Sequence, residues 1–383
     1  MNGVTGQSSL FFLLLLSCFF LFLMYIRLTL ASIRMKPLER NIGEISNREI
    51  TVILPFRNEY EILQKTLPSL IKEIQNDRNS NLILVNSASN DFPPEAYWGL
   101  MENSGLASSI WKMISSPEPG KCTALNKAMQ TAHTSNLIIN IDADIIIQEG
   151  TFKKFRSWFS DWKIGAVSGT ETFFQETEHP MANYKIYSNK LRSYESSLWG
   201  TISLEGSLLA WDPERIGWEK FDENTNADDA QISLKSIISG HRSILDPSIT
   251  FIDSRDLKKG SFRRLIRRSQ GLSSQIIRNL KSGLSFKNKN MRDAYYSSLI
   301  LYIIVPWCVF FILSFPGLFL LTDSEKITNN WAVGLSIAPS VFLYMSILTR
   351  TGKNLVLGSV ASITGHVKAL FGLKVSGWNP GMN

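Results

Sequence analysis

Two carboxylates separated by one residue, Asp142 and Asp144, lie within the apolar stretch NLIINIDADIII of residues 136–147. Isolated charges are costly to bury, so we expect these carboxylates to bind something. Side chains two positions apart lie on the same side of an extended strand, roughly 7 Å apart, so both are predicted to face one cleft. Hard oxygen ligands suit Mg2+ or Mn2+ shared with substrate phosphates. A solvated turn is the alternative, because Asp-x-Asp alone is a weak signal.

Three further polar motifs precede this pair. LPFRNE contains Pro55, Arg57 and Glu59, VNSASND contains Asn86, and GKCTALNKA contains Lys121. The first two are compatible with simple turns, since Pro55 would end a strand and Glu59 would favour the positive start of a helix. The third is compatible with an amphipathic helix, although Gly-Lys at a helix N-terminus also suits an anion.

The stretches between these motifs alternate between strand and helix patterns. Apolar runs predict strands at residues 49–56, 81–87 and 136–147, and helical spacing predicts helices at 59–75 and 120–133. Strand and helix in alternation, with continuous apolar strands, indicates an α/β fold with a parallel sheet covered on both faces. Because ligands bind beyond the carboxyl ends of such strands, the polar motifs are expected to meet at one edge.

Apolar segments of membrane-helix length occur at residues 10–26, 299–321 and 332–348 of the 383-residue chain. No Lys or Arg precedes the first segment, whereas Arg27, Arg34, Lys36 and Arg40 follow it. An uncleaved anchor with the middle of the chain on the cytoplasmic side is therefore predicted, making this an integral membrane protein.

A further apolar segment, residues 354–373, contains glycines and charges, so it could span the membrane, re-enter it or lie on its surface. The three cysteines and four histidines show neither a disulfide framework nor zinc-ligand spacing.

The order of six motifs along the chain adds more than any motif alone. LPFRNE, VNSASND, GKCTALNKA, DAD, SLEGSLLAWDPERI and FDENTNADDAQISLKSIISGHRSILDP together resemble the membrane-associated glycosyltransferases of family 2, over about residues 50–271. The resemblance implies a GT-A fold with a mixed, mainly parallel sheet flanked by helices. It also implies a nucleotide-diphosphate sugar donor, with a UDP-sugar favoured, a divalent cation, and inversion at the anomeric carbon.

The resemblance also implies roles on the donor side of the site. Asn86 stands where the family usually has an aspartate, and it can accept a hydrogen bond from the base through its amide oxygen. Asp144 matches the usual metal ligand of the family, with Asp142 beside it. The residues implied to bind the nucleotide are Pro55, Arg57, Glu59, Asn86, Lys121 and Asp142.

On the acceptor side, Asp229 in ADDAQISLK matches the general base of the family. An inverting displacement needs one carboxylate to take the proton of the attacking hydroxyl. The alternative is that Asp228 and Asp229 merely cap a surface helix. Asp228, Gly206, Arg264 and Arg267 are placed on the acceptor and phosphate side.

The basic stretch FRRLIRRSQGL falls where many relatives carry a Gln/Arg-x-x-Arg-Trp motif, with Arg268 in place of the Trp. Independently of the family, Arg264, Arg267 and Arg268 share one helical face opposite Leu265. Such a helix suits anionic headgroups or the membrane interface, or simply flanks the next span on its positive side.

These interpretations divide the chain into four parts: a membrane anchor at 1–35, a cytoplasmic GT-A domain at 48–255, basic amphipathic interface helices at 256–296, and a transmembrane region at 297–373. The expected function is transfer of one sugar to a lipid-linked or membrane-proximal acceptor. The alternatives are a processive polysaccharide synthase and a non-enzymatic basic membrane scaffold. Nucleic acid is not an expected partner of this chain of net charge +7, because the positive charge abuts a membrane span and few aromatics interleave it.

Overall fold

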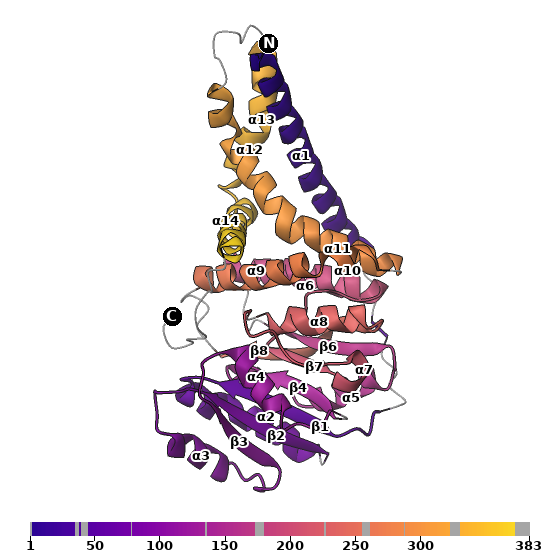
Figure 1. Ribbon diagram of the computed structural model, residues 1–383, viewed down its shortest axis with the longest axis vertical. Coiled ribbons are helices and arrows are strands. Elements are labelled where there is room, and N and C mark those ends of the chain that lie inside the picture. The colour runs from indigo at the N-terminus through magenta and orange to yellow at the C-terminus, as the bar shows by residue number, and fades with distance from the viewer. Residues whose placement is uncertain are drawn as a thin grey trace.

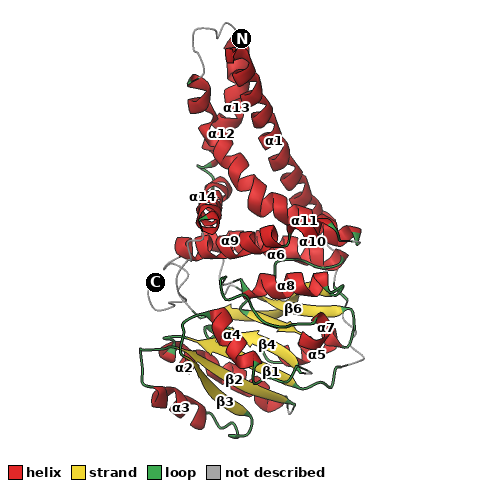
Figure 2. Cartoon of the chain, viewed as in Figure 1, coloured by secondary structure: helices red, strands yellow, loops and turns green. Residues whose placement is uncertain are grey.

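The computed structural model describes residues 2–34, 38–39, 45–77, 79–134, 136–172, 180–225, 227–254, 261–286, 288–321 and 330–371. An α/β domain occupies one end of an elongated molecule, and long helices extend from it at the other end (Figure 1). Several helices lie crosswise between these two parts (Figure 2). Lys36, Arg40 and residues 255–260, which contributed to the predicted positive flanks, lie outside the described residues.

Eight strands among the described residues form one sheet in the order β3-β2-β1-β4-β7-β6-β8-β5. β1 is parallel to β2 and β4, β2 to β3, and β6 to β8, whereas β7 and β5 run antiparallel to their neighbours. The predicted mixed, mainly parallel sheet is therefore confirmed. The strands are β1 (Ile50–Phe56), β2 (Ser80–Ser87), β3 (Trp111–Ser116), β4 (Leu137–Ile141), β5 (Ile145–Ile147), β6 (Ile164–Glu171), β7 (Leu208–Trp211) and β8 (Arg242–Asp253).

The predicted helices at 59–75 and 120–133 are present as α2 and α4, although α4 ends earlier than expected. The helices of the described residues are α1 (Asn2–Arg34), α2 (Tyr60–Asn76), α3 (Pro94–Glu102), α4 (Lys121–Met129), α5 (Thr151–Phe159), α6 (Pro180–Leu198), α7 (Pro213–Ile216), α8 (Asp228–Ile238), α9 (Ser261–Arg278), α10 (Leu280–Leu284), α11 (Lys289–Leu299), the π-helical turn η1 (Ile300–Ile304), α12 (Val305–Leu320), α13 (Asn330–Ser346) and α14 (Arg350–Leu370).

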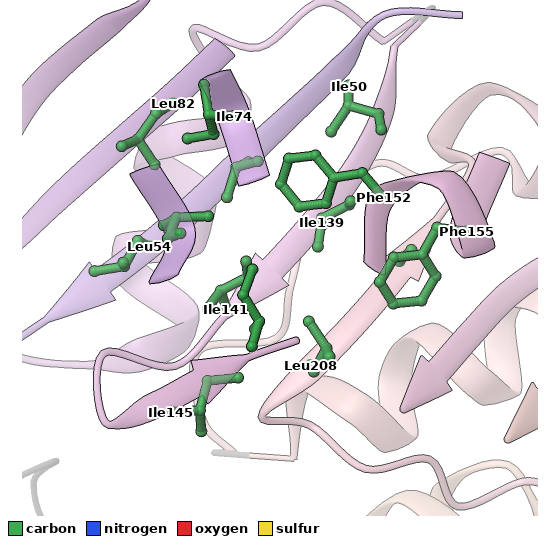
Figure 3. Packing of buried hydrophobic residues seen from close by; sticks show 14 of the residues in the cluster. Ile50, Leu54, Ile74, Leu82, Ile139, Ile141, Ile145, Phe152, Phe155 and Leu208 are labelled. Carbon is green, nitrogen blue, oxygen red and sulfur yellow. The ribbon is translucent and has the colours of Figure 1, made fainter. Parts of the chain in front are cut away.

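Apolar side chains cover both faces of the sheet. On one face, Ile50, Leu54 and Ile139 pack against Ile74 of α2 and Phe152 of α5 (Figure 3). The other face is covered by residues of α4 and α8. This double coverage explains the continuous apolar strands in the sequence, because a strand buried on both faces has no polar side.

The stretch at residues 136–147 is not one strand, which corrects the prediction. β4 ends at Ile141, and the backbone then turns through Asp142, with Ile145 N donating to Asp142 O at 3.4 Å. β5 begins at Ile145 and pairs with β8 at the far edge of the sheet. The prediction failed because β-branched residues continue on both sides of the turn, so apolar pattern alone gave no break.

The long helices form their own apolar cluster. Phe11 of α1 packs edge-on against Phe315 of α12 with ring centroids 6.0 Å apart. Two helical stretches, Ser8–Arg27 and Lys289–Phe319, are long and apolar enough to cross a membrane, which by itself is weak support for membrane association. In α13, the apolar stretch Ile337–Ser346 is shorter.

A crosswise layer joins the helices to the α/β domain. α14 packs along α9 and against α12, and it runs crosswise to α1 and α12 (Figure 1). A Cβ on Gly365 of α14 would lie 2.9 Å from Gln270 N of α9, so a glycine allows this close contact. The N-terminal helix is tied to the same layer, since Arg27 Nη2 lies 3.4 Å from Oε1 of the buried Glu195 of α6.

Candidate active site

The turn after β4 carries the two carboxylates that the sequence singled out. Asp142 N donates to Ser207 O at 2.9 Å, which fixes this turn against the segment leading into β7. The backbone oxygen of Asp144 accepts from both N and Oγ of Ser254, each at 2.8 Å. Asp144 is 1% exposed, whereas the Asp142 side chain is 24% exposed, so the two carboxylates have different surroundings. The solvated-turn alternative was correct about the turn and wrong about Asp144.

Lys121, at the start of α4, connects two acidic segments that are far apart in sequence. Its Nζ lies 2.7 Å from Asp142 Oδ1 and 3.0 Å from Asp228 Oδ2. It also donates to Gly206 O at 3.3 Å. Burial acts to lower the pKa of Lys121, but attraction to Asp142 and Asp228 outweighs it and raises the pKa. The structure therefore brings Lys121 and Asp142, predicted to bind the nucleotide, together with Asp228 and Gly206, predicted on the acceptor and phosphate side.

Asp229 lies beside this network in the first turn of α8. Burial and the charge of Asp228 raise the pKa of the Asp229 carboxyl to about 6. Asp228 is more deeply buried than Asp229, and burial raises its pKa against the opposing attraction of Lys121. A carboxylate with a pKa near neutrality is suited to accept a proton, because it is ionised at physiological pH yet more basic than an ordinary aspartate.

Gly206 lies against the Asp229 side chain. A Cβ at position 206 would be 3.2 Å from Asp229 Cβ and 3.4 Å from Asp229 Oδ2. The 3.2 Å contact is tighter than ordinary packing, so a larger residue at position 206 would shift Asp229 by a few tenths of an ångström. A glycine here thus sets the position of Asp229 as well as giving Lys121 its carbonyl partner.

At the carboxyl ends of β1 and β2, hydrogen bonds join the two loops that follow these strands. Asn58 has a left-handed φ of 53°, its N–H donates to Ser89 Oγ at 3.0 Å, and its Oδ1 accepts from Asn90 N at 2.7 Å. Arg57 N donates to Glu59 Oε2 at 3.2 Å. Arg57 and Glu59, predicted to line the nucleoside pocket, thus lie in a loop whose backbone is held in place.

Pro55 and Asn86 lie at the same end of neighbouring strands. Pro55 is paired with Val85 in the register, and Phe56 with Asn86. The Asn86 side-chain oxygen, which the sequence predicted to accept from a base, accepts from Ser89 N at 2.9 Å. The NH2 group of the same amide is a donor. Asn86 is therefore better suited to donate a hydrogen bond to the base than to accept one from it.

The arginine face of α9 is turned toward the acidic residues. Burial and the neighbouring Arg268 lower the pKa of Arg267, while Asp142 and Asp228 act in the opposite direction. Arg267 therefore lies within electrostatic reach of both carboxylates. Arg264 acts on Arg267 as a further positive charge, which places the two predicted arginines in one cationic cluster.

Comparison with known families decides which chemistry this arrangement serves. Residues 51–207 match the model of "Glycosyl transferase family 2". The chain carries a family 2 glycosyltransferase domain. The predicted family 2 domain is thereby confirmed, and the alternative of a non-enzymatic scaffold is set aside. Asp228, Asp229 and the α9 arginines follow the matched residues.

Comparison with solved structures supports the fold of this glycosyltransferase. The mannosyltransferase PcManGT from Pyrobaculum calidifontis, in complex with GDP-Man and Mn2+, is similar with a TM-score of 0.74 and 21% identity, covering 94% of this chain and 99% of that one. S. aureus TarS 1–349 in complex with UDP-GlcNAc is similar with a TM-score of 0.45 and 12% identity, covering 85% and 89%. The first likeness shows a common fold, whereas the second is too weak to do so. A search of curated protein sequences finds no match.

The residues of the glycosyltransferase suit a hard divalent cation shared with a substrate. Within the described parts of the chain, no group of three or more His, Cys, Asp or Glu could enclose a metal. Mg2+ and ions like it are usually held by one or two carboxylates together with substrate phosphates. The Asp142–Asp144 turn fits that pattern. Because Asp142 already shares Lys121 with Asp228, Asp144 is the better candidate for direct contact.

Two charged residues of the site were missed in the sequence. Glu205 is buried, and its carboxylate lies 3.2 Å from Arg192 Nη1 of α6 and 3.9 Å from Arg268 Nη2 of α9. Glu205 had a usable signal, since it is a lone charge in the apolar stretch SLEGSLL. Arg192 had none, because nothing in the pattern of α6 distinguishes it from a surface arginine.

Proposed function

We propose that this enzyme transfers a sugar from a nucleotide-diphosphate sugar to a hydroxyl of a lipid-linked or membrane-proximal acceptor, with inversion at the anomeric carbon. The observation that carries this proposal is Asp229, a half-buried carboxylate with a pKa raised to about 6, placed by Gly206 beside the Lys121 network. Asp229 takes the proton from the acceptor hydroxyl as its oxygen attacks the anomeric carbon.

The donor diphosphate is assigned to the region between the β4 turn and α9. Asp144, with Asp142, would hold Mg2+ or Mn2+, and the cation supplies positive charge for the leaving diphosphate when bound. Lys121 keeps Asp142 in place, and its positive charge offsets the negative charges of Asp142 and Asp228. Arg267 and Arg264 add positive charge on the phosphate side.

The nucleoside is assigned to the joined loops after β1 and β2, with Pro55, Arg57, Glu59 and Asn86 around it. Tyr60 and Phe92 stack beside them with ring centroids 4.2 Å apart. The sequence favoured a UDP-sugar. The fold shared with a mannosyltransferase described with GDP-Man and Mn2+ supports testing GDP-mannose first, alongside UDP-sugars.

The enzyme is assigned to a membrane, with its catalytic domain on the cytoplasmic side. The apolar stretches Ser8–Arg27 and Lys289–Phe319 support this, and so do the exposed apolar side chains of Ile277, Leu280 and Leu284 in the crosswise layer. Basic residues next to exposed apolar ones are typical of helices at a membrane surface.

A processive polysaccharide synthase is the second candidate. Its product would be a ladder of lengths instead of one added sugar. The helices of the described residues offer little wall for a channel, which favours single transfer. Electrophoresis or mass spectrometry of the product separates the two directly.

Asp144→Ala tests the proposal. Full-length enzyme should turn over its donor only with Mg2+ or Mn2+, lose turnover in EDTA, and regain it when the metal is restored. Asp144→Ala should lower turnover by at least a hundredfold, consistent with losing about 3 kcal/mol of transition-state stabilisation. Glu149→Ala is the matched control, because Glu149 is an exposed carboxylate paired with the exposed Lys72. Full activity of Asp144→Ala without metal would overturn the assignment.

A further inference from the structure

We propose that α14 lies in the plane of the membrane at its cytoplasmic surface, with one apolar face inserted among the acyl chains of the lipids. This face, called the outer face of α14, consists of Leu357, Val360, Thr364, Val367 and Phe371. The inference rests on the proposed membrane location of the enzyme. It selects one of the three placements that the sequence allows for residues 354–373.

The outer face is regular in spacing and exposed. Its members follow one another at intervals of three or four residues, which places them on one side of a helix. The exposed fractions of its four apolar side chains range from 37% for Val367 to 76% for Phe371. Thr364, the polar member, donates its hydroxyl to Val360 O at 2.7 Å, so the helix itself satisfies this donor. The outer face therefore presents an apolar surface to its surroundings.

The opposite side of α14 is held by α9 and α12. A Cβ on Gly365 would lie 2.9 Å from Gln270 N of α9, so the two helices are in close contact. His366 is buried, and its Nδ1 accepts from Trp307 Nε1 of α12 at 3.1 Å. Its Nε2 then carries the proton and donates to Ser273 Oγ of α9 at 2.9 Å. These contacts fix the rotation of α14 about its own axis, so the outer face is turned away from α9.

The apolar surface of α14 continues from that of a membrane-length helix. α14 packs against α12, whose Phe310 is 53% exposed and belongs to the apolar stretch Lys289–Phe319. The apolar side chains of the outer face thus extend this exposed surface onto a second helix. An acyl chain that covers α12 would reach the outer face without crossing a polar region, which makes lipid the occupant that fits this face.

The direction of α14 distinguishes a helix at the membrane surface from a span. α14 runs crosswise to α1 and α12 (Figure 1), and it is not among the described stretches that are apolar enough to cross a membrane. It is also one continuous helix from Arg350 to Leu370, so it does not turn back on itself as a re-entrant segment would. A helix with one apolar face, lying across spanning helices, is suited to the boundary between headgroups and acyl chains.

The lysines of α14 are compatible with this placement. Lys353 is exposed and lies on the side of the outer face, but it precedes all the apolar members. Lys368 is half-buried and lies at the margin of the face. Long lysine side chains can lay their stems along apolar surface while the ammonium group reaches the headgroups. Neither charge therefore prevents insertion of the face.

The test places the photoreactive residue p-benzoylphenylalanine at one site at a time in the full-length chain, reconstituted in sealed phosphatidylcholine vesicles. The sites are Val360 of the outer face, Phe12 of α1 and Trp162 of the α/β domain, all of which are exposed. After irradiation, mass spectrometry measures the yield of lipid adducts. The yield at Val360 should be close to that at Phe12 and at least about tenfold above that at Trp162, because acyl chains surround only the first two sites.

A second measurement on wild type tests the in-plane direction. A membrane-impermeant amine reagent is added in excess to the sealed vesicles, and the protein is then cleaved after arginine. No arginine follows Arg350, so Lys353 and Lys368 remain on one peptide. An in-plane helix exposes both lysines on the same side of the membrane, so this peptide should be modified at both or at neither. Peptides modified at one of the two lysines alone would show a span and overturn the inference.

The crosslinking results separate this inference from the proposed function. Lipid adducts at Phe12 without lipid adducts at Val360 would overturn the inference, and so would equal yields at Val360 and Trp162. A covalent dimer, or a crosslink within the chain, as the main product at Val360 would show that protein covers the outer face and would overturn it too. Absence of lipid adducts at Phe12 would instead contradict the proposed membrane location. Thermal unfolding of each variant verifies that it is folded.

Discussion

The donor side and the acceptor side of the candidate active site are built in different ways. On the donor side, Asn58, Ser89 and Asn90 join two adjacent loops through hydrogen bonds to backbone groups. On the acceptor side, Asp228 forms an ion pair with Lys121 of the donor diphosphate region, more than a hundred residues away in sequence. The donor side is thus formed by neighbouring strands of the sheet, whereas the acceptor side depends on charged side chains brought together by the whole fold.

This difference has a functional consequence. Hydrogen bonds to backbone groups fix geometry and depend little on pH. Buried charges instead set the pKa values of their neighbours, as Asp228 does for Asp229. We therefore expect the chemical step to be sensitive to charge and pH, and donor binding to be sensitive mainly to loop shape.

The largest effect should come from Asp229→Asn. Removing the base should lower kcat by about 10²–10⁴ while leaving donor affinity nearly unchanged. In wild type, the base must be ionised, and its pKa is raised to about 6, so kcat/KM should fall as pH drops through that value and level off above it. A pH profile of both proteins measures this. A wild-type profile that is flat between pH 5 and 8 would contradict the role of Asp229.

A smaller effect is expected from Gly206→Ala, which perturbs the acceptor side without removing a charge. The added Cβ would lie 3.2 Å from Asp229 Cβ and shift the carboxylate, so kcat should fall by about tenfold or more. Gly99→Ala is the matched control, because a Cβ there meets nothing within 4 Å and Gly99 lies in α3. The control should keep full activity and unfold at a slightly higher temperature. Equal activity of both variants would show that Asp229 has room to move.

The smallest effect is expected on the donor side, from Asn58. Asn58→Ala loses the hydrogen bond from Asn90 N, and the alanine must still adopt the left-handed φ of 53°. Each effect destabilises the loop conformation by about 1 kcal/mol. Asn58→Gly loses only the hydrogen bond. The Kd for nucleotide, measured by calorimetry, should rise more in Asn58→Ala than in Asn58→Gly, with kcat little changed in both. A large loss of kcat would contradict the separation of the two sides.

Much of the fold was predictable because buried parallel strands leave an apolar pattern, as residues 50–56 and 80–87 show. The turn at Asp142 was not, because Ile145 continues the apolar pattern on another strand. Sequence order and family resemblance proposed Asp229 and Lys121. Their shared network and the raised pKa of Asp229 could not be predicted, since both depend on burial and on distances across the fold.

The Glu205 cluster was the least predictable part. Arg192 and Arg268 meet one carboxylate from two different helices, and no local spacing connects them. Pairings of this kind arise only from tertiary packing. Because of these pairings, the acceptor side is not formed by residues at the ends of strands alone.

The ion pair between Arg27 and Glu195 has a consequence for the order in which the protein is made. The arginine is synthesised 168 residues before the glutamate that it will neutralise. The first helix must therefore remain available until α6 has emerged from the ribosome. A chain trimmed to the catalytic domain would enclose Glu195 without the charge of Arg27, leaving it the Thr201 hydroxyl and the more distant charge of Arg192, at a cost on the order of 3–5 kcal/mol. The N-terminal helix is thus a folding partner of the enzyme and more than its attachment.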